Sequence, residues 1–199
     1  MFIGKYNKSV IITYIGVILS FCGMMFVYQN EISYGMICLI FAGICDLFDG
    51  KVARMCKRNE EEKEFGKQLD SMADVFSFLA FPSVLGIVML EKWMYPVLIL
   101  YILAGIIRLS WFHITTKEEG NQTHYFGLPV TYAALILPIL YVIRLLANIN
   151  GTYLFSVGYF IIAVLFVLNV KIPKPKGIWY VIFSVMAVIV TGIIFVIGT

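Results

Sequence analysis

The sequence places all four of its aspartates inside one short stretch, DLFDGKVARMCKRNEEEKEFGKQLDSMAD, and has none elsewhere. They are Asp46, Asp49, Asp70 and Asp74. Carboxylates gathered this closely repel one another unless cations lie among them. Aspartate oxygens without histidine or cysteine ligands favour Mg²⁺, Mn²⁺ or Ca²⁺ over zinc. We therefore predict a divalent-cation site to which all four carboxylates contribute.

Helical spacing would bring these residues onto two helix faces. The stretch follows the patterns D-x-x-D-G-x-x-A-R and then G-x-x-x-D-x-x-x-D, each typical of one face of a helix. The fixed positions are Asp46, Asp49, Gly50, Ala53 and Arg54, followed by Gly66, Asp70 and Asp74. A short connection favours packing of the two helices side by side, which would bring the carboxylates together. Glycine inside a helix costs about 1 kcal/mol relative to alanine, so the two glycines indicate places where a ligand approaches the backbone. We expect the charged run KRNEEEKE between the two patterns to form a solvated loop.

The elements that must hold these helix ends are apolar. With 61% hydrophobic residues, 14% charged residues and a mean hydropathy of +0.91, the chain lies outside the range of water-soluble domains. Seven apolar runs are long enough to cross a bilayer as helices. They cover residues 10–28, 32–48, 75–90, 95–112, 126–146, 153–170 and 178–197. We predict an all-α fold: a polytopic integral membrane helical bundle of about seven transmembrane helices, forming a single membrane-embedded domain over residues 1–199. Membrane lipids would surround it, and we expect no nucleic-acid partner.

Basic residues predict the orientation of the bundle, because cytoplasmic loops retain lysine and arginine. Lysines and arginines gather before the first run, between the second and third runs, and after the fourth and sixth runs, which all fall on one side of the membrane. The connections on the other side contain a single basic residue, Lys92. The aspartate stretch would then lie on the cytoplasmic side, and the chain would end outside. The first run has no small-residue cleavage site after it, so we interpret it as a retained helix. In a prokaryote the membrane would be the plasma membrane.

The eight fixed positions resemble the signature of the CDP-alcohol phosphatidyltransferases, membrane enzymes that transfer a phosphatidyl group from a CDP-linked lipid to an alcohol and release CMP. All eight match, although residues 55–65 form a longer spacer than the family usually has. The resemblance implies that Asp46, Asp49 and Asp70 bind one or two divalent cations, Mg²⁺ or Mn²⁺. It also implies that Asp74 lies at the metals and acts as the general base, and that the protein is a homodimer. The residues implied to bind CDP-diacylglycerol are Asp49, Gly50, Ala53, Arg54 and Gly66.

The acceptor alcohol must be inferred from residues outside the signature. An acceptor that carries a phosphate would need two or more fixed cations opposite it. Outside the signature the apolar runs contain only two cationic residues, Arg108 and Arg144. Arg144 falls near the outer end of its helix. One arginine suits one carboxylate, which indicates an amino acid, although Lys67 could also reach the site.

A second group of residues follows the proline-containing turn at 127–129, which suits the start of a helix. Thr131 and Tyr132 would then direct hydroxyl groups towards the cytoplasmic cleft and could contact serine. The segments QLDSMADVFSF, RLSWF and YFGLPVTYAA look like the phosphatidylserine synthase branch of the family, which transfers the phosphatidyl group to L-serine. The departures from that branch are Leu79, Ser110, Trp111 and His113.

Alternatives remain open on the sequence alone. The acceptor could be glycerol 3-phosphate or inositol phosphate, with the same family chemistry. A divalent cation transporter could use the carboxylates as a permeation site, but it would need polar residues that continue across the bilayer. An aspartate-rich prenyltransferase is also metal-dependent, but the glycine, alanine and arginine positions would have no role in it. The signature contains no obvious serine, cysteine or histidine nucleophile, which favours direct attack by the alcohol.

Overall fold

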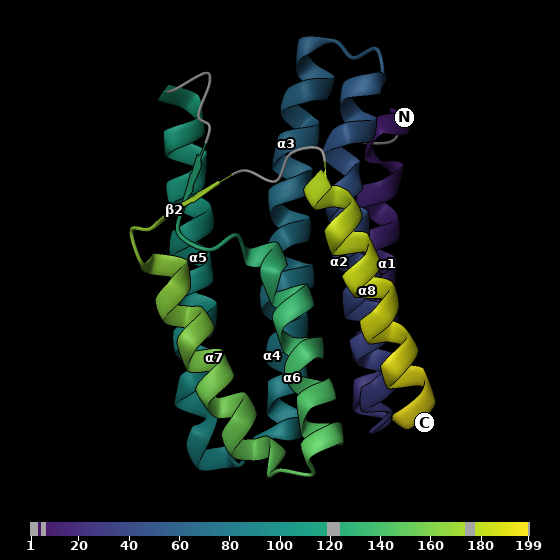
Figure 1. Ribbon diagram of the computed structural model, residues 1–199. Helices are drawn as coiled ribbons and strands as arrows, with labels where there is room; N and C mark the ends of the chain where they lie inside the picture. The colour runs from purple at the N-terminus through teal and green to yellow at the C-terminus, as the bar shows by residue number, and fades with distance from the viewer. Residues whose placement is uncertain (1–3, 5–6, 119–123, 174–177, 199) are drawn as a thin grey trace.

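The computed structural model describes residues 4, 7–118, 124–173 and 178–198, and these form a bundle of helices (Figure 1). The helices are α1 (Ile11–Tyr28), α2 (Ile32–Met55), α3 (Glu60–Asp74), α4 (Phe81–Met89), α5 (Tyr95–Glu118), α6 (Ala133–Ala147), α7 (Gly151–Val167) and α8 (Ile178–Ile197). Short 3₁₀ turns at Lys8–Val10, Lys92–Met94 and Val130–Tyr132 lead into α1, α5 and α6. A π-helical segment, η2 (Val75–Ala80), joins α3 to α4. The predicted all-α class is confirmed.

Six of the described helical segments are long and apolar enough to cross a membrane, so the protein is an integral membrane protein. They are Lys8–Tyr28, Ile32–Met55, Glu60–Met89, Lys92–Thr115, Val130–Ala147 and Tyr180–Ile197. The predicted run at 153–170 corresponds to α7, which is equally apolar but has 17 residues. At 1.5 Å per residue it extends for about 26 Å, close to the thickness of the hydrocarbon core. Among the described residues, the six long segments together with the shorter α7 agree with the prediction of about seven transmembrane helices.

The prediction that the charged run at 57–64 forms a loop was wrong. Instead of a loop through KRNEEEKE, helix α3 begins at Glu60, and the break between α2 and α3 is confined to the residues just before it. The Asn59 side chain accepts a hydrogen bond from the Glu62 N–H at 2.8 Å, and Glu62 accepts one from the Asn59 N–H at 2.9 Å. This capping box satisfies free N–H groups at the helix start, and three glutamates in the first turn favour the positive end of the helix dipole.

The helix that carries the last two aspartates changes its winding immediately after Asp74. Pro82 has no N–H with which to bond the carbonyl of Phe78, as the residue four positions later would in a regular helix. The buried Tyr101 hydroxyl on α5 donates to that carbonyl at 2.5 Å, and Tyr159 on α7 donates to the Pro82 carbonyl at 2.5 Å. Tyr101 therefore holds the π-helical segment, and Tyr159 holds the first turn of α4 that follows it.

A short antiparallel pairing, which the sequence analysis did not predict, joins β1 (His124–Phe126) to β2 (Lys171–Pro173). It ties the segment that precedes α6 to the segment that follows α7 (Figure 1). Gly127 follows with φ +75°, and a side chain there would place its Cβ 2.6 Å from the Phe166 carbonyl oxygen. The predicted turn at 127–129 is confirmed, and its helix begins at Val130 rather than at residue 126.

Candidate metal centre and active site

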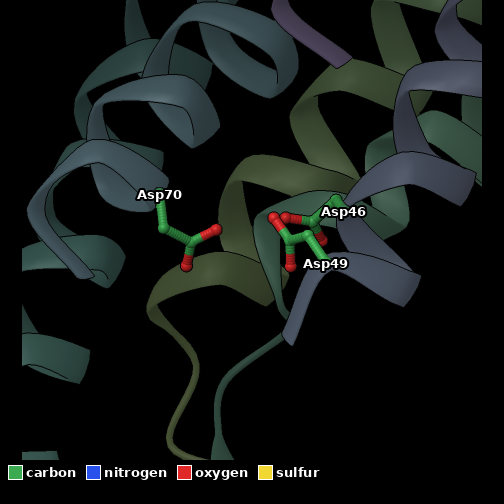
Figure 2. A group of neighbouring side chains, drawn as sticks. All are labelled: Asp46, Asp49 and Asp70. Carbon is green, nitrogen blue, oxygen red and sulfur yellow. The ribbon is translucent and has the colours of Figure 1, made fainter. Parts of the chain in front are cut away.

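Two helices bring the aspartates together from opposite sides. Asp46 and Asp49 lie one turn apart on α2, and Asp70 faces them from α3 (Figure 2). One carboxylate oxygen from each of these three residues lies within 4.8 Å of the other two. Metal–oxygen bonds of about 2.0–2.6 Å to Mg²⁺ or Ca²⁺ are compatible with that spacing. The ends of α2 and α3 therefore converge as predicted, and three of the four aspartates form a group that could hold a metal.

Asp74 completes the cluster, although it is not a member of the three-oxygen group. It lies one turn beyond Asp70 on α3 and interacts with the Asp46 carboxylate. Its Oδ1 is buried and has no hydrogen-bond partner within the part of the chain that the structure describes. A buried carboxylate oxygen left in this way is expensive unless a cation or a proton donor occupies the adjoining space. The donor set and this oxygen both fit a divalent cation.

Two threonine hydroxyls from other helices orient carboxylates on α2. Thr13 on α1 donates to Asp49 Oδ2 at 3.0 Å, and Thr131 in the turn before α6 donates to Asp46 Oδ2 at 2.8 Å. Such outer-shell hydrogen bonds fix the direction of a metal-ligating carboxylate. Thr13 could not be identified from the sequence, because nothing in its local pattern connects it to Asp49, 36 positions later.

Helix α5 contributes a histidine and an arginine to the same region. His113 Nε2 lies 2.5 Å from the Ser71 hydroxyl and is close enough to Asp70 to interact with its charge. Arg108, only 7% exposed, interacts with the charge of Asp46 and lies 5.0 Å from the centre of the Phe112 ring. The predicted location of Arg108 on the aspartate side is observed, whereas His113 had not been predicted as a site residue.

The two signature glycines each have an arginine over their open side. A Cβ at Gly50 would lie 3.8 Å from Arg54 Nη1, and a Cβ at Gly66 would lie 3.6 Å from Arg58 Nη1. Arg58 Nε is buried and makes no hydrogen bond within the described residues. Arg58 was not predicted as a site residue from the sequence, although a basic residue so close to the signature was a usable signal.

The remaining predicted residues differ in how they relate to the cluster. Tyr132 is half-buried and packs edge-on against Phe183 at 5.4 Å between ring centres. Lys67 is 72% exposed and lies 3.9 Å from Glu64 on its own helix. Ala53 lies half-buried on the same face of α2 as the aspartates. A cavity of about 240 Å³ adjoins the cluster and includes Asp46 and Tyr132 in its lining.

Comparison with known proteins identifies the family. A family model described as CDP-alcohol phosphatidyltransferase matches residues 6–170. The chain is 27% identical over 152 residues to archaetidylserine synthase of Methanothermobacter thermautotrophicus, covering 75% of this chain and 62% of that protein. It is 33% identical over 115 residues to the CDP-diacylglycerol--serine O-phosphatidyltransferase of Saccharomyces cerevisiae, covering 53% of this chain and 41% of that protein. It is 28% identical over 187 residues to the protein of that name from Helicobacter pylori, covering 88% of this chain and 77% of that protein.

The match covers α1 to α7 and includes all eight signature positions, whose aspartates the fold gathers at one place. The chain therefore belongs to the CDP-alcohol phosphatidyltransferase family.

Proposed function

We propose that the protein transfers the phosphatidyl group of CDP-diacylglycerol to L-serine and forms phosphatidylserine and CMP. The observation that carries this proposal is the meeting of three carboxylates from α2 and α3 beside the buried Arg108. The names of the Saccharomyces cerevisiae and Helicobacter pylori relatives, which are serine O-phosphatidyltransferases, support the same acceptor. Family membership gives no support to the transporter alternative.

Asp46, Asp49 and Asp70 would hold one or two divalent cations, Mg²⁺ or Mn²⁺, with Asp74 at the edge of the site. A cation bound there would neutralise the diphosphate and stabilise the CMP that leaves. Thr13 and Thr131 would keep Asp49 and Asp46 directed at this position. The hydroxyl of Thr131 would thus hydrogen-bond to the Asp46 carboxylate, whereas the sequence had suggested a direct contact with serine.

Asp74 is the proposed general base. Its Oδ1, which has no hydrogen-bond partner among the described residues, would be available to accept the proton of the serine hydroxyl. The serine oxygen would then form a bond to the phosphorus of the phosphatidyl group, while the bond from that phosphorus to the CMP oxygen breaks and CMP leaves with the electron pair. No covalent enzyme intermediate is needed for this exchange.

The substrates would occupy two sides of the cluster. Gly50, Ala53 and Gly66 would form the floor for the cytidine diphosphate, next to Asp49 and Arg54. Arg58 joins this proposed set because its guanidinium lies over Gly66. On the other side, Arg108 would bind the serine carboxylate, with Tyr132 and the exposed Lys67 as further candidates for contact with serine.

The choice of serine over a phosphorylated acceptor depends on the number of cations. Arg144 lines a different cavity, together with the residues that connect α6 to α7. With Arg54 and Arg58 assigned to the donor, Arg108 is the buried cation that remains beside the aspartates among the described residues, which suits one carboxylate better than a phosphate.

The remaining proposals concern the whole protein. The basic residues around the aspartates favour an active site on the cytoplasmic side, in the plasma membrane if the source is prokaryotic. We also propose that residues 1–199 act as one catalytic domain and that two copies form a homodimer, as the family resemblance implies.

The test is CMP release by the purified protein in detergent with CDP-diacylglycerol and Mn²⁺. L-serine, glycerol 3-phosphate and inositol phosphate are compared as acceptors, with the Asp74→Asn variant in parallel. We expect release that requires serine and that falls by about 10²- to 10⁴-fold in the variant. Release with a phosphorylated acceptor alone would contradict the choice of serine, and unchanged release in the variant would contradict the base assignment.

A further inference from the structure

A second cavity, of about 550 Å³, lies at the end of the bundle away from the aspartates. Its volume is within the range of about 300–1,000 Å³ that is usual for ligand sites. Its lining comes from the α1–α2 turn, the end of α4 and the α6–α7 connection, which lie at one end of the bundle (Figure 1). Ile32 in this lining precedes Asp46 on α2 by about 21 Å at 1.5 Å per residue. This α4–α6–α7 cavity is therefore separate from the proposed active site.

The polar part of the lining offers hydrogen-bond donors and one formal positive charge. Arg144 supplies the charge, and the side-chain amides belong to Asn30, Asn148 and Asn150. The Asn150 side-chain oxygen accepts a hydrogen bond from the Thr152 N–H, so the amino group of that amide remains to donate. The described residues of the lining include no carboxylate. The lining therefore suits an anion.

The Arg144 side chain crosses the start of α7. A Cβ at Gly151 would lie 2.6 Å from both Cδ and Nε of Arg144, so the glycine leaves room for the arginine there. The N-terminus of α7 also carries the positive end of its helix dipole. Among the described residues, no carboxylate forms an ion pair with Arg144. The last turn of α6 explains a basic residue at this position, but it does not explain why two positive groups meet without an anion between them.

Exposed aromatic side chains indicate the level of the membrane surface at this end. Tyr28 at the end of α1, Trp93 before α5 and Tyr153 in the first turn of α7 are 86%, 65% and 57% exposed. Tryptophan and tyrosine gather at the level of the lipid headgroups. Lipid phosphates therefore lie at the level of the cavity, and arginine binds phosphate oxygens through two parallel hydrogen bonds.

We infer that the α4–α6–α7 cavity binds a phosphate group, and that the headgroup of an anionic membrane lipid supplies it. Arg144 would bind the phosphate oxygens, and the amides of Asn30 and Asn148 would donate further hydrogen bonds. A lipid bound there would connect three inter-helix segments and stabilise the folded bundle. The inference goes beyond the proposed function, because it involves none of the residues assigned to catalysis or to the substrates.

The first test is titration of the purified protein with phosphatidylglycerol in a neutral detergent, with bound lipid counted by native mass spectrometry. EDTA is present, so that no cation attracts the same lipid to the aspartates. We expect Arg144→Gln to weaken the tightest binding by about 10- to 100-fold, as for loss of a hydrogen-bonded charge pair. Lys92→Gln is the matched control, because it removes one positive charge from an exposed residue at the same end, outside the lining. Equal binding by the two variants would overturn the inference.

Gly151→Ala tests the position of the guanidinium without a change of charge. Alanine is more favourable than glycine within a helix, but its methyl group would displace the Arg144 side chain. We expect weaker binding of phosphatidylglycerol and no loss of thermal stability in lipid-free detergent. Gly192→Ala on α8 is the control, because a Cβ there would have no neighbour within 4 Å among the described residues. Wild-type affinity in Gly151→Ala would contradict the proposed site.

Inorganic phosphate distinguishes a lipid headgroup from a free ion. Isothermal titration calorimetry in the same buffer compares phosphate binding to the wild type and to Arg144→Gln. We expect weaker binding of phosphate than of phosphatidylglycerol, with the same dependence on Arg144, because the ion lacks the apolar contacts of the lipid. Binding of phosphate without binding of the lipid would support the phosphate site and overturn the lipid as its source. Absence of saturable binding of either would overturn the inference as a whole.

Discussion

Each end of the bundle has a cavity with polar residues in its lining, and the two sets of polar residues serve different purposes. At the end away from the aspartates, a cavity of about 550 Å³ includes Arg144, Asn150 and Thr152. There Asn150 caps α7 by accepting a hydrogen bond from the Thr152 N–H at 2.9 Å. The Arg144 guanidinium lies 5.9 Å from the ring centre of Tyr141. These groups complete helix ends and pack on aromatic surface.

At the aspartate end the cavity is smaller, about 240 Å³, and Asp46 in its lining belongs to the cluster of aspartates that also interacts with the buried Arg108. Gathering that much negative charge is costly to the fold unless a cation is bound, so it needs a functional reason. The larger of these two cavities is therefore not the one beside the proposed active site, which is distinguished by its cluster of carboxylates. We expect substitutions at the aspartate end to impair activity and substitutions at the other end to leave it unchanged.

The largest expected effect is that of metal removal. Treatment with EDTA should abolish CMP release, and added Mn²⁺ should restore it, because the carboxylates lose the cation that pairs with the diphosphate. Binding of Mn²⁺, followed by electron paramagnetic resonance, should fall sharply in Asp70→Asn. Glu61→Gln, on the first turn of the same helix, is the control and should bind Mn²⁺ like the wild type. Full activity in EDTA would contradict the metal site.

Exchange of an arginine at each end is the next test. Arg108→Gln should raise the KM for serine by about 10- to 100-fold, the loss expected for a hydrogen-bonded charge pair, with a smaller change in kcat. Arg144→Gln, at the opposite end, should leave both parameters near their wild-type values. Steady-state kinetics with varied serine measures both. A larger rise in the KM for serine in Arg144→Gln than in Arg108→Gln would contradict the assignment of serine binding to the aspartate end.

Threonine hydroxyls allow a finer comparison of the two ends. Thr13→Val removes the hydrogen bond to Asp49 and should weaken Mn²⁺ binding by about 10- to 100-fold, as loss of an outer-shell partner does. Thr152→Val removes a hydroxyl at the other end, where it lies 3.5 Å from the Met89 carbonyl oxygen. A Mn²⁺ titration of both variants is the measurement. Equal affinities in the two would show that Thr13 does not position Asp49.

The smallest expected effect is on stability next to the site. Tyr101→Phe leaves the buried Phe78 carbonyl without its donor and should lower the free energy of unfolding by about 1–3 kcal/mol. Tyr95→Phe is the control, because the exposed Tyr95 hydroxyl donates to the Ile87 carbonyl at 3.1 Å, where water or headgroups can replace it. Denaturant unfolding in detergent compares the two. Equal stability of the variants would contradict the role assigned to Tyr101.

Several features could be read from the sequence because they depend on local pattern. The apolar runs predicted the helices, and helical periodicity predicted that Asp46 and Asp49 share one face of α2. The start of α3 was also readable, since an asparagine followed three residues later by glutamate is typical of a capping box, but the density of charge was interpreted as a loop. Local signals therefore determined the fold class, the family resemblance and the identity of the carboxylates.

Other features depend on contacts between distant segments, which no local pattern encodes. Thr13 meets Asp49 only because α1 packs along α2, and Tyr101 meets Phe78 only because α5 lies beside the π-helical segment. The side chains that α8 adds to the lining of the 240 Å³ cavity have the same origin, since an apolar helix of uniform composition does not reveal which face contacts α2. The sequence determined which carboxylates could gather at one place, because side-chain type and spacing are local properties. The tertiary structure alone decided which groups orient them, because that follows from the packing of helices across the bundle.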